Sequence, residues 1–381
     1  MDLSAIPVVD QHCHPWLRPS SPYNAETFRL LFTEGVDPRL GDGVSDTIYY
    51  RWMIRELARI FDCEPNEKTV LVARRELGHN AVARRLMAEA KIEAAVLDYG
   101  FVGRGADFFV PAEMATQLGG AETVQALRLE SLLESLVRAA ADAGEVEERF
   151  RARLNRTDLL GSGVVSLKSI VAYRSGLAIA PPDRPAAYAA FPMLKREAET
   201  QGTVRIVHKA FLDYFIDIAL AWANDERFPV QFHTGFGDPT VFLRTGNPIM
   251  LREVLESRRY RDVPLVLLHA GWPYVRELSY LASVYPNVWA DVGLAIPFAA
   301  TDYETIIRQL LSLAPSTRIL YSSDGFAIPE HTWFATVHGR NALASVLTDL
   351  KRRDMIGADD AWQIANDILR NNARRLYGLD D

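Results

Sequence analysis

Histidines at the ends of strand-like segments are the residues of this sequence best suited to chemistry. Four of the eight histidines, His12, His14, His233 and His269, lie at or just beyond the carboxyl end of an apolar segment. A buried imidazole requires a polar partner. The spacing of His12 and His14 puts both rings on one face of a strand, with Cys13 on the other. Two neutral imidazoles side by side suit zinc, manganese or iron.

An aspartate extends this pattern. Asp324 ends the last strand-like segment, which lies beside the first strand in a closed barrel, so that its carboxylate reaches the same ion. His233 arrives from the fifth segment, across the barrel mouth. We therefore predict that His12, His14, His233 and Asp324 hold a divalent metal, most favourably zinc, and leave room for water or substrate. The alternative is an incidental histidine pair, with the other histidines satisfied by contacts in the core.

Eight apolar segments, most of them rich in β-branched or aromatic residues, predict the strands that position these side chains. Segments with helical periodicity lie between them, for instance at 248–260, 274–284 and 303–313. Strands that alternate with helices predict an α/β fold, and the count of eight favours a (β/α)8 TIM barrel, whose active site lies at the carboxyl ends of the strands. The predicted strands are 8–12, 92–98, about 126–130, 164–170, 230–233, 265–269, 288–292 and 318–324.

The stretch between the first two strands is longer than a barrel requires. It predicts a helical insertion at about 20–90, with helices at 25–34, 45–61 and 68–90, that acts as a lid, a specificity element or a dimer contact. We expect two helices within 184–227 and one long helix over 359–376, ended by Gly378. The chain is expected to be one barrel domain over 1–381.

Composition excludes several classes of protein. The net charge is -7, and the sequence shows no stripe of basic residues that could neutralise phosphates, which argues against a general nucleic-acid-binding protein. Cys13 and Cys63 can form at most one disulfide, which favours a reducing compartment. The sequence shows neither a secretory signal nor an apolar run of about 20 residues. A soluble, cytoplasmic protein without a membrane partner is expected.

With these motifs the sequence resembles the amidohydrolase superfamily, specifically amidohydrolase family 2. It is particularly similar to the amidohydrolase-related domains that precede glutamine synthetase-like domains in some fungal and plant proteins. The resemblance spans nearly the whole chain apart from the insertion. It implies metal ligation by His12, His14, His233 and Asp324, with His269 as a second ligand or as a group that polarises the substrate. The matching motifs are VDQHCH at 9–14, QFHTG at 231–235, LHAG at 268–271, YSSDG at 321–325 and NNARRLY at 371–377.

Lys168 lies on the predicted fourth strand. A buried lysine must be paired or modified. In binuclear members of the superfamily a lysine at this place is carboxylated and bridges two metals, whereas members of family 2 are often mononuclear and lack it. The number of metal ions, one or two, is therefore open, and a second ion depends on carboxylation of Lys168. The alternative is that Lys168 is unmodified and pairs with a carboxylate at the barrel mouth.

Other residues near the strand ends are candidates for substrate contact. Arg174 follows the fourth strand and Arg128 ends the third; either guanidinium could hold a substrate carboxylate, and a structural ion pair is the alternative for each. Trp16 follows His14 and would wall the pocket or pack in the core. His331 follows the eighth strand and would contact the substrate.

These residues predict hydrolysis of an amide, lactone or related bond in a small, carboxylate-bearing molecule, with metal-activated water and Asp324 as general base. His269, or the metal, would polarise the carbonyl. One alternative is metal-dependent decarboxylation or sugar-acid isomerisation at the same site. Another is a non-catalytic barrel that serves as a binding module. The substrate stays open, and a homo-oligomer is expected on general grounds.

Overall fold

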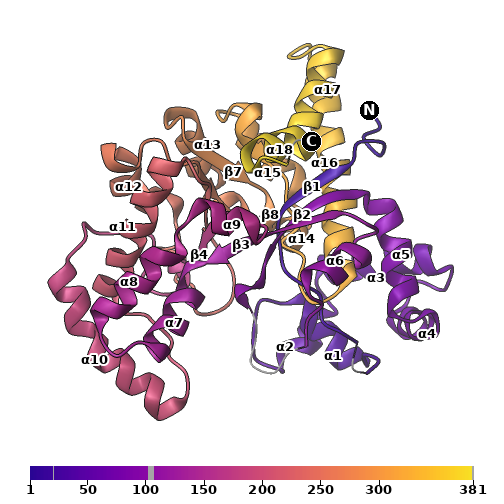
Figure 1. Cartoon of the computed structure of the whole chain (residues 1–381). Helices are drawn as coiled ribbons and strands as arrows, with labels where there is room; N and C mark the ends of the chain where they lie inside the picture. The colour runs from indigo at the N-terminus through magenta and orange to yellow at the C-terminus, as the bar shows by residue number, and fades with distance from the viewer. Residues whose placement is uncertain (20, 102–106, 380–381) are drawn as a thin grey trace.

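The computed structural model describes residues 1–19, 21–101 and 107–379. In this part of the chain eight parallel strands form one sheet, in the order β1-β2-β3-β4-β5-β6-β7-β9 (Figure 1). Their bounds are β1 Val8–Cys13, β2 Ile92–Asp98, β3 Glu122–Arg128, β4 Val164–Ser169, β5 Val230–Phe232, β6 Leu265–Leu267, β7 Val288–Asp291 and β9 Ile319–Leu320; the short β8, Gly293–Leu294, lies outside this sheet.

Backbone hydrogen bonds close the sheet into a barrel. The Gln11 N–H donates to the Tyr321 carbonyl over 3.3 Å, and the Asp324 N–H donates to the His12 carbonyl over 3.0 Å. The predicted (β/α)8 barrel is therefore confirmed. The last strand is shorter than expected: it ends at Leu320, and Asp324 has a φ of 52°, outside the extended range.

Apolar side chains cover both faces of the sheet, as in other parallel barrels. One cluster lies between the strands and the outer helices and includes Leu97 and Leu167. A second cluster brings together residues of β1, β2, β3, β4, β6 and β9 with Tyr377 of the last helix. The Tyr377 hydroxyl donates to Gln11 Oε1 over 2.6 Å, so the carboxyl-terminal helix reaches into the barrel interior.

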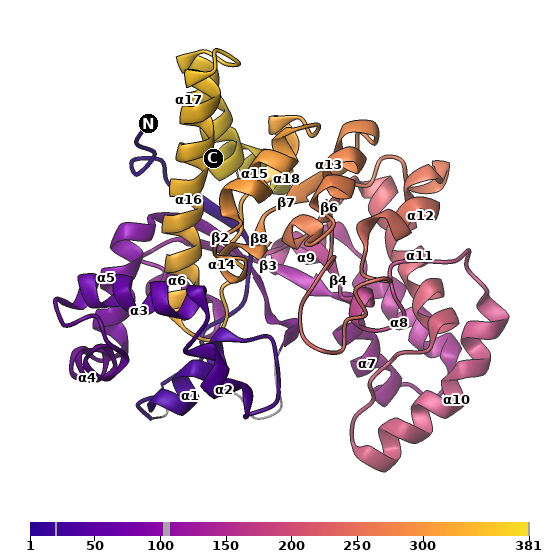
Figure 2. The ribbon, with the colours of Figure 1, turned by 180° about the vertical axis from the view of Figure 1, so that it is seen from behind.

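Helices surround the sheet (Figures 1 and 2). Five of those described lie between β1 and β2, and α5 packs against α16 beside them. The α-helices are α1 Ala25–Arg29, α2 Leu40–Val44, α3 Ile48–Phe61, α4 Glu67–Leu77, α5 His79–Ala90, α6 Pro111–Gln117, α7 Leu129–Ala139, α8 Ala143–Arg153, α9 Arg156–Gly161, α10 Arg184–Gln201, α11 Lys209–Glu226, α12 Arg252–Glu256, α13 Val275–Val284, α14 Ala295–Phe298, α15 Tyr303–Leu311, α16 Pro329–Arg352, α17 Ala358–Asn366 and α18 Asn372–Tyr377.

One helical expectation is wrong, and another is confirmed with a local change. The periodic segment 248–260 is not one helix but a 3-10 turn, the short α12 and a second 3-10 turn, because Ser257 is extended between them. The single helix expected over 359–376 and ended by Gly378 is present: helical residues run without a break from Ala358 to Tyr377, with a π-helical segment, Asp367–Asn371, inside this run. The Ile368 carbonyl there accepts the Tyr321 N–H over 3.1 Å, which ties this segment to the end of β9.

Candidate metal centre

A register shift in β1 aims its histidines into the barrel mouth. Asp10 pairs with Ala95 of β2, but the next paired residue is Cys13 with Leu97, so that β1 has one residue more than β2 over this span. Such bulges turn a side chain to the other face of a strand. Cys13 packs in the outer apolar cluster, whereas His12 and His14 line the cavity at the carboxyl ends of the strands.

Three side chains converge there. The Nε2 atoms of His12 and His14 lie 3.2 and 3.3 Å from Oδ1 of Asp324. Their candidate ligand atoms all lie within 4.8 Å of one another. Ligand atoms around a zinc-type ion, each about 2.0–2.2 Å from the metal, are about 3–3.5 Å apart. The observed spacing fits such an ion.

Protonation also fits a cation between these groups. His14 Nδ1 lies 3.0 Å from the Asp98 carbonyl oxygen. Because a carbonyl only accepts, Nδ1 carries the proton, and in the neutral ring Nε2 presents a lone pair to Asp324. Two acceptors then face each other over 3.3 Å, an arrangement that a metal ion would stabilise. The bond from Nδ1 fixes the ring, as outer partners of metal-binding histidines do.

Burial governs the charges in this group. It lowers the pKa of His12 to about 4, and Lys168 acts in the same direction, which leaves the imidazole neutral. Burial alone raises the pKa of Asp324, but the electrostatic influence of His269 and of the nearby His12 and His14 holds it well below its usual range. Neutral imidazoles beside an ionised carboxylate are the protonation states that a divalent metal binds.

The other two strand-end histidines, one of them the predicted ligand His233, lie next to this group but outside the set of ligand atoms within 4.8 Å of one another. The ring centroid of His269 is 5.7 Å from that of His12 and 4.4 Å from that of His233. His233 Nε2 lies 3.0 Å from the Phe236 carbonyl oxygen. In that tautomer the lone pair of His233 is on Nδ1. Both ring nitrogens of His269 are buried without a hydrogen-bond partner in the described chain.

Lys168 faces the metal group from β4. Its side chain is almost wholly buried, and its Nζ lies 3.1 Å from His12 Nε2. Burial lowers the pKa of Lys168 to about 8, against the opposing effect of the Asp98 and Asp324 carboxylates. No carboxylate of the described residues lies within ion-pair distance of Nζ. The amine therefore has a larger neutral fraction near neutral pH than an ordinary lysine, and the neutral form can react with carbon dioxide.

Two buried aspartates hold the backbone beside Asp324 and His269. Asp10 accepts the Ser323 N–H over 2.8 Å and the Ser323 hydroxyl. Asp291 accepts four hydrogen bonds, from Gln11 Nε2, the Ser322 hydroxyl and the N–H groups of His269 and Gly293, over 2.7 to 3.0 Å. These bonds hold the backbone at or next to two residues with a positive φ, which is 52° for Asp324 and 68° for His269. Such conformations persist where the surroundings determine them.

A cavity of about 530 Å³ opens above these residues. Its size suits a small molecule. Part of its wall comes from the segment between β1 and β2, which therefore borders the mouth. The lining consists of His12, His14, Lys168, His233, His269 and Asp324, of residues 30, 31 and 33–36, and of Gly100, Arg128, Ser131, Glu134, Ile170, Tyr173, Arg174, Arg205, Asp238, Thr240, Leu294, Phe298, Phe326 and His331.

The candidate substrate residues have different surroundings. Arg128 lines the cavity, but its Nε and Nη2 donate to Asp98 Oδ2 over 3.1 and 2.6 Å, the structural ion pair considered as its alternative. Arg174 also lines it, with Nη1 2.8 Å from Glu134 Oε1. His331 borders it, with Nδ1 2.8 Å from the Tyr49 hydroxyl.

Trp16 does not reach the cavity. Its side chain is fully buried in the outer apolar cluster, and its indole N–H donates to the Thr332 hydroxyl over 3.2 Å. The expectation that it walls the pocket is therefore wrong, and core packing describes it.

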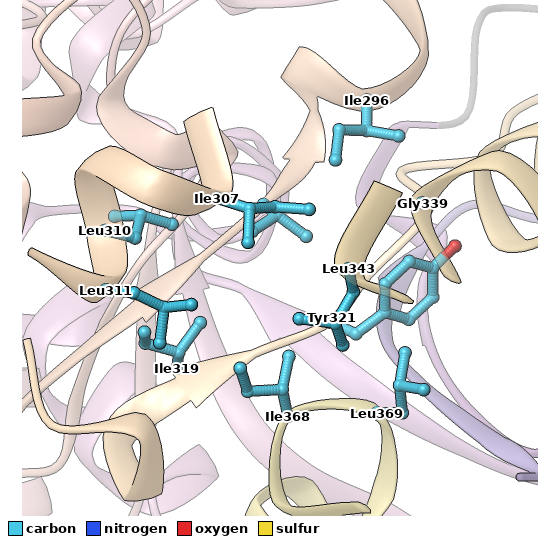
Figure 3. Close-up of a pocket in the computed structure, with 11 residues that line it drawn as sticks. Ile296, Ile307, Leu310, Leu311, Ile319, Tyr321, Gly339, Leu343, Ile368 and Leu369 are labelled. Carbon is cyan, nitrogen blue, oxygen red and sulfur yellow. The ribbon is translucent and has the colours of Figure 1, made fainter. Parts of the chain in front are cut away.

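A separate apolar void lies between β9 and helices α15 and α16 (Figure 3). Ile307, Leu310, Tyr321 and Leu343 are among its lining residues. With a volume of about 20 Å³ it has room for about one water molecule and offers that water no suitable set of polar partners. It is not a substrate site.

Several residues of the site were not singled out from the sequence. Asp291 ends the seventh strand as Asp324 ends the eighth segment, and that shared pattern was a usable signal. Glu34, Glu134, Arg205 and Asp238 come from helices and loops, where no periodicity marks a cavity-lining residue.

The chain has recognisable relatives. A family model described as amidohydrolase matches residues 9–379. Protein fluG of Emericella nidulans is 27% identical over 405 residues; the alignment covers 98% of this chain and 46% of fluG. The chain thus spans about half the length of that relative. In the described part of the chain no helix has the length and apolar character to cross a membrane.

Solved structures share the fold. A protein assigned as a metal-dependent hydrolase from Lactobacillus casei superposes with a TM-score of 0.89 at 24% identity, covering 99% of this chain and 96% of that one. A uronate isomerase from Thermotoga maritima superposes with a TM-score of 0.66 at 13% identity, covering 98% and 95%. At these identities the likeness concerns the architecture.

Proposed function

The chain belongs to the amidohydrolase family, and on that premise we propose that it is a metal-dependent hydrolase of an amide, lactone or related bond in a small, carboxylate-bearing molecule. One observation carries the proposal. The Nε2 atoms of His12 and His14 face Asp324 Oδ1 at 3.2 and 3.3 Å on the floor of a cavity large enough for such a substrate.

The proposed ligands are His12, His14 and Asp324, with His233 or His269 completing the set. A divalent cation held there, zinc in the first place and manganese or iron as alternatives, would supply Lewis acidity and lower the pKa of water to about 7. A second ion depends on carboxylation of Lys168.

The chain's own groups supply the remaining chemistry. Asp324 accepts the proton of the attacking water and returns it to the leaving group. His269 has one N–H to donate as a neutral ring and no partner for it in the described structure, so it is placed to stabilise charge on the substrate carbonyl oxygen. The Arg174 guanidinium holds the substrate carboxylate.

The test is metal analysis of the purified chain followed by a substrate panel of N-acyl amino acids, γ-glutamyl compounds and lactones in oxygen-labelled water. We expect bound divalent metal and one solvent oxygen atom in the product. A chain that binds no divalent metal, or a metal-loaded chain that turns over none of the panel, would contradict the proposal.

The same site supports a second candidate, metal-dependent decarboxylation or sugar-acid isomerisation, because a Lewis acid beside a carboxylate stabilises a developing carbanion. Uronate isomerases share the architecture. Conversion of a uronate or an acidic substrate without incorporation of solvent oxygen would favour that reaction over hydrolysis.

A further inference from the structure

Glu34 is a cavity-lining carboxylate that the described chain leaves without a counter-charge. It belongs to the segment between β1 and β2, is partly buried, and lines the same cavity as His12 and Asp324. Among the described residues, no hydrogen-bond donor or cation pairs with its side chain. An enclosed carboxylate without such a partner costs free energy.

The surroundings of Glu34 have the same sign of charge. Burial raises the pKa of Glu34 to about 8, and the carboxylates of Asp324 and Asp238 act in the same direction. Within the described chain, the Asp238 carboxylate accepts hydrogen bonds only from the N–H and hydroxyl of Thr240 and forms no ion pair. A positively charged group of a ligand would favour the ionised form of Glu34 here.

Another part of the cavity wall, between β4 and β5, carries the positively charged side chains Arg174 and Arg205. The Arg174 side chain is 7% exposed, its Nη1 forms an ion pair with Glu134, and its buried Nε has no hydrogen-bond partner in the described structure. The Arg205 guanidinium donates to the Tyr173 carbonyl and the Thr240 hydroxyl and forms no ion pair with a carboxylate of the described residues. Among the described residues, Glu134 pairs with Arg174 and no carboxylate pairs with the Arg205 guanidinium, so this part of the wall has positive charge available for an anion.

We propose that the cavity takes an ampholyte, a small molecule whose carboxylate binds Arg174 and whose ammonium group binds Glu34. The inference rests on the proposed function, since it names the substrate class of the same site. It goes beyond a carboxylate-bearing substrate because Glu34 adds a second point of recognition, from a segment outside the barrel strands. Amino-acid derivatives with a cleavable bond between the two charges are the class that fits.

Binding of simple probes tests this without knowledge of the substrate. The full, zinc-loaded chain is titrated calorimetrically with straight-chain carboxylates from propanoate to heptanoate, and with the ω-amino acid of each chain length. The two series differ by one ammonium group. For at least one length we expect the amino acid to bind about ten- to a hundredfold more tightly, the effect of one charge-assisted hydrogen bond in an enclosed site.

Variants assign the preference to its residues. Glu34→Gln should bring the two series to nearly equal affinity without weakening the plain carboxylates, and Arg174→Gln should weaken both series alike. Glu26→Gln, the same change at an exposed position of α1, should behave as the unmodified chain. Unchanged zinc content checks that each variant is folded.

Equal affinities of the two series in the unmodified chain, a preference that survives Glu34→Gln, or no binding of either series would each overturn the inference. Loss of turnover in Glu34→Gln with the preference intact would also count against it, since that result assigns Glu34 to proton transfer. Failure of the proposed hydrolysis is a separate result, because the preference is measured by binding alone.

Discussion

Oδ2 of Asp291 accepts the backbone N–H of His269 over 2.9 Å, and this bond joins the end of β7 to the turn that follows β6. His269 has a φ of 68°, which a non-glycine residue adopts only with support. The same carboxylate accepts from Gln11 and Ser322, on β1 and just after β9. The buried Asp291 side chain therefore links β1, the turn after β6 and the segment after β9 at the barrel mouth.

Replacement of this carboxylate tests its role in positioning His269. Asp291→Asn turns one acceptor into a donor that faces other donors, so we expect a loss of about 3 kcal/mol in the free energy of unfolding. In protein shown to be folded, turnover should fall with little change in KM, because the imidazole moves but the cavity stays. Denaturant titration and steady-state kinetics measure the two effects. Unchanged turnover per folded molecule would show that Asp291 serves stability alone.

Asp324→Asn tests the proton acceptor. Asparagine has the shape of aspartate and tolerates the φ of 52° at this position, so the fold should persist, as circular dichroism can verify. The amide cannot accept the proton, and turnover should fall about 10²- to 10⁴-fold. Near-normal turnover would remove Asp324 from the mechanism.

Metal content tests the histidines of β1. His12→Ala and His14→Ala should each lower zinc affinity by more than the about 10–100-fold that loss of an outer partner costs. Competition with a chromophoric chelator gives the affinity. His338→Phe is the matched control, because this histidine packs against Trp52 and Phe334 outside the cavity; an equal loss of zinc in the control would point to general unfolding.

Bicarbonate tests Lys168. A buried amine whose pKa is lowered to about 8 is reactive towards carbon dioxide near neutral pH. Addition of bicarbonate should add the mass of one carbon dioxide in gentle intact-mass spectra and raise the metal content from one ion towards two. Lys168→Met should show neither change. A single ion and an unmodified mass in both proteins would leave Lys168 as an unmodified amine beside His12.

Stability at low pH follows from His338. Burial lowers the pKa of His338 to about 4 from its ordinary 6.5, so below about pH 6.5 the unfolded chain binds a proton that the folded chain does not. The stability that the neutral ring provides is present above pH 6.5 and is lost as pH falls towards 4, by about 3 kcal/mol. In His338→Phe the fall in unfolding free energy over this range should be smaller by that amount, as urea titrations at several pH values will measure. Parallel curves for the two proteins would contradict the assignment.

Local sequence patterns determine the order of the strands and place His12, His14 and Asp324 near strand ends. Alternation and apolar runs depend on near neighbours in the chain, and a closed parallel barrel brings the first and last strands together whatever the loops contain. The barrel and the convergence of these three side chains could therefore be predicted from the sequence. Metal binding by them stays a prediction for the experiments above.

Tertiary structure decided the partners of the remaining groups. Whether Arg128 faces a substrate or Asp98, whether Trp16 lines the cavity or the core, and which way the His233 ring turns depend on register and packing between distant segments. Glu34 and Arg174 lie far apart in the sequence and became lining residues of one cavity through the path of the chain between the strands. Local periodicity specifies which face of a strand a residue occupies, but the group it meets across a cavity is fixed only when the whole barrel has closed.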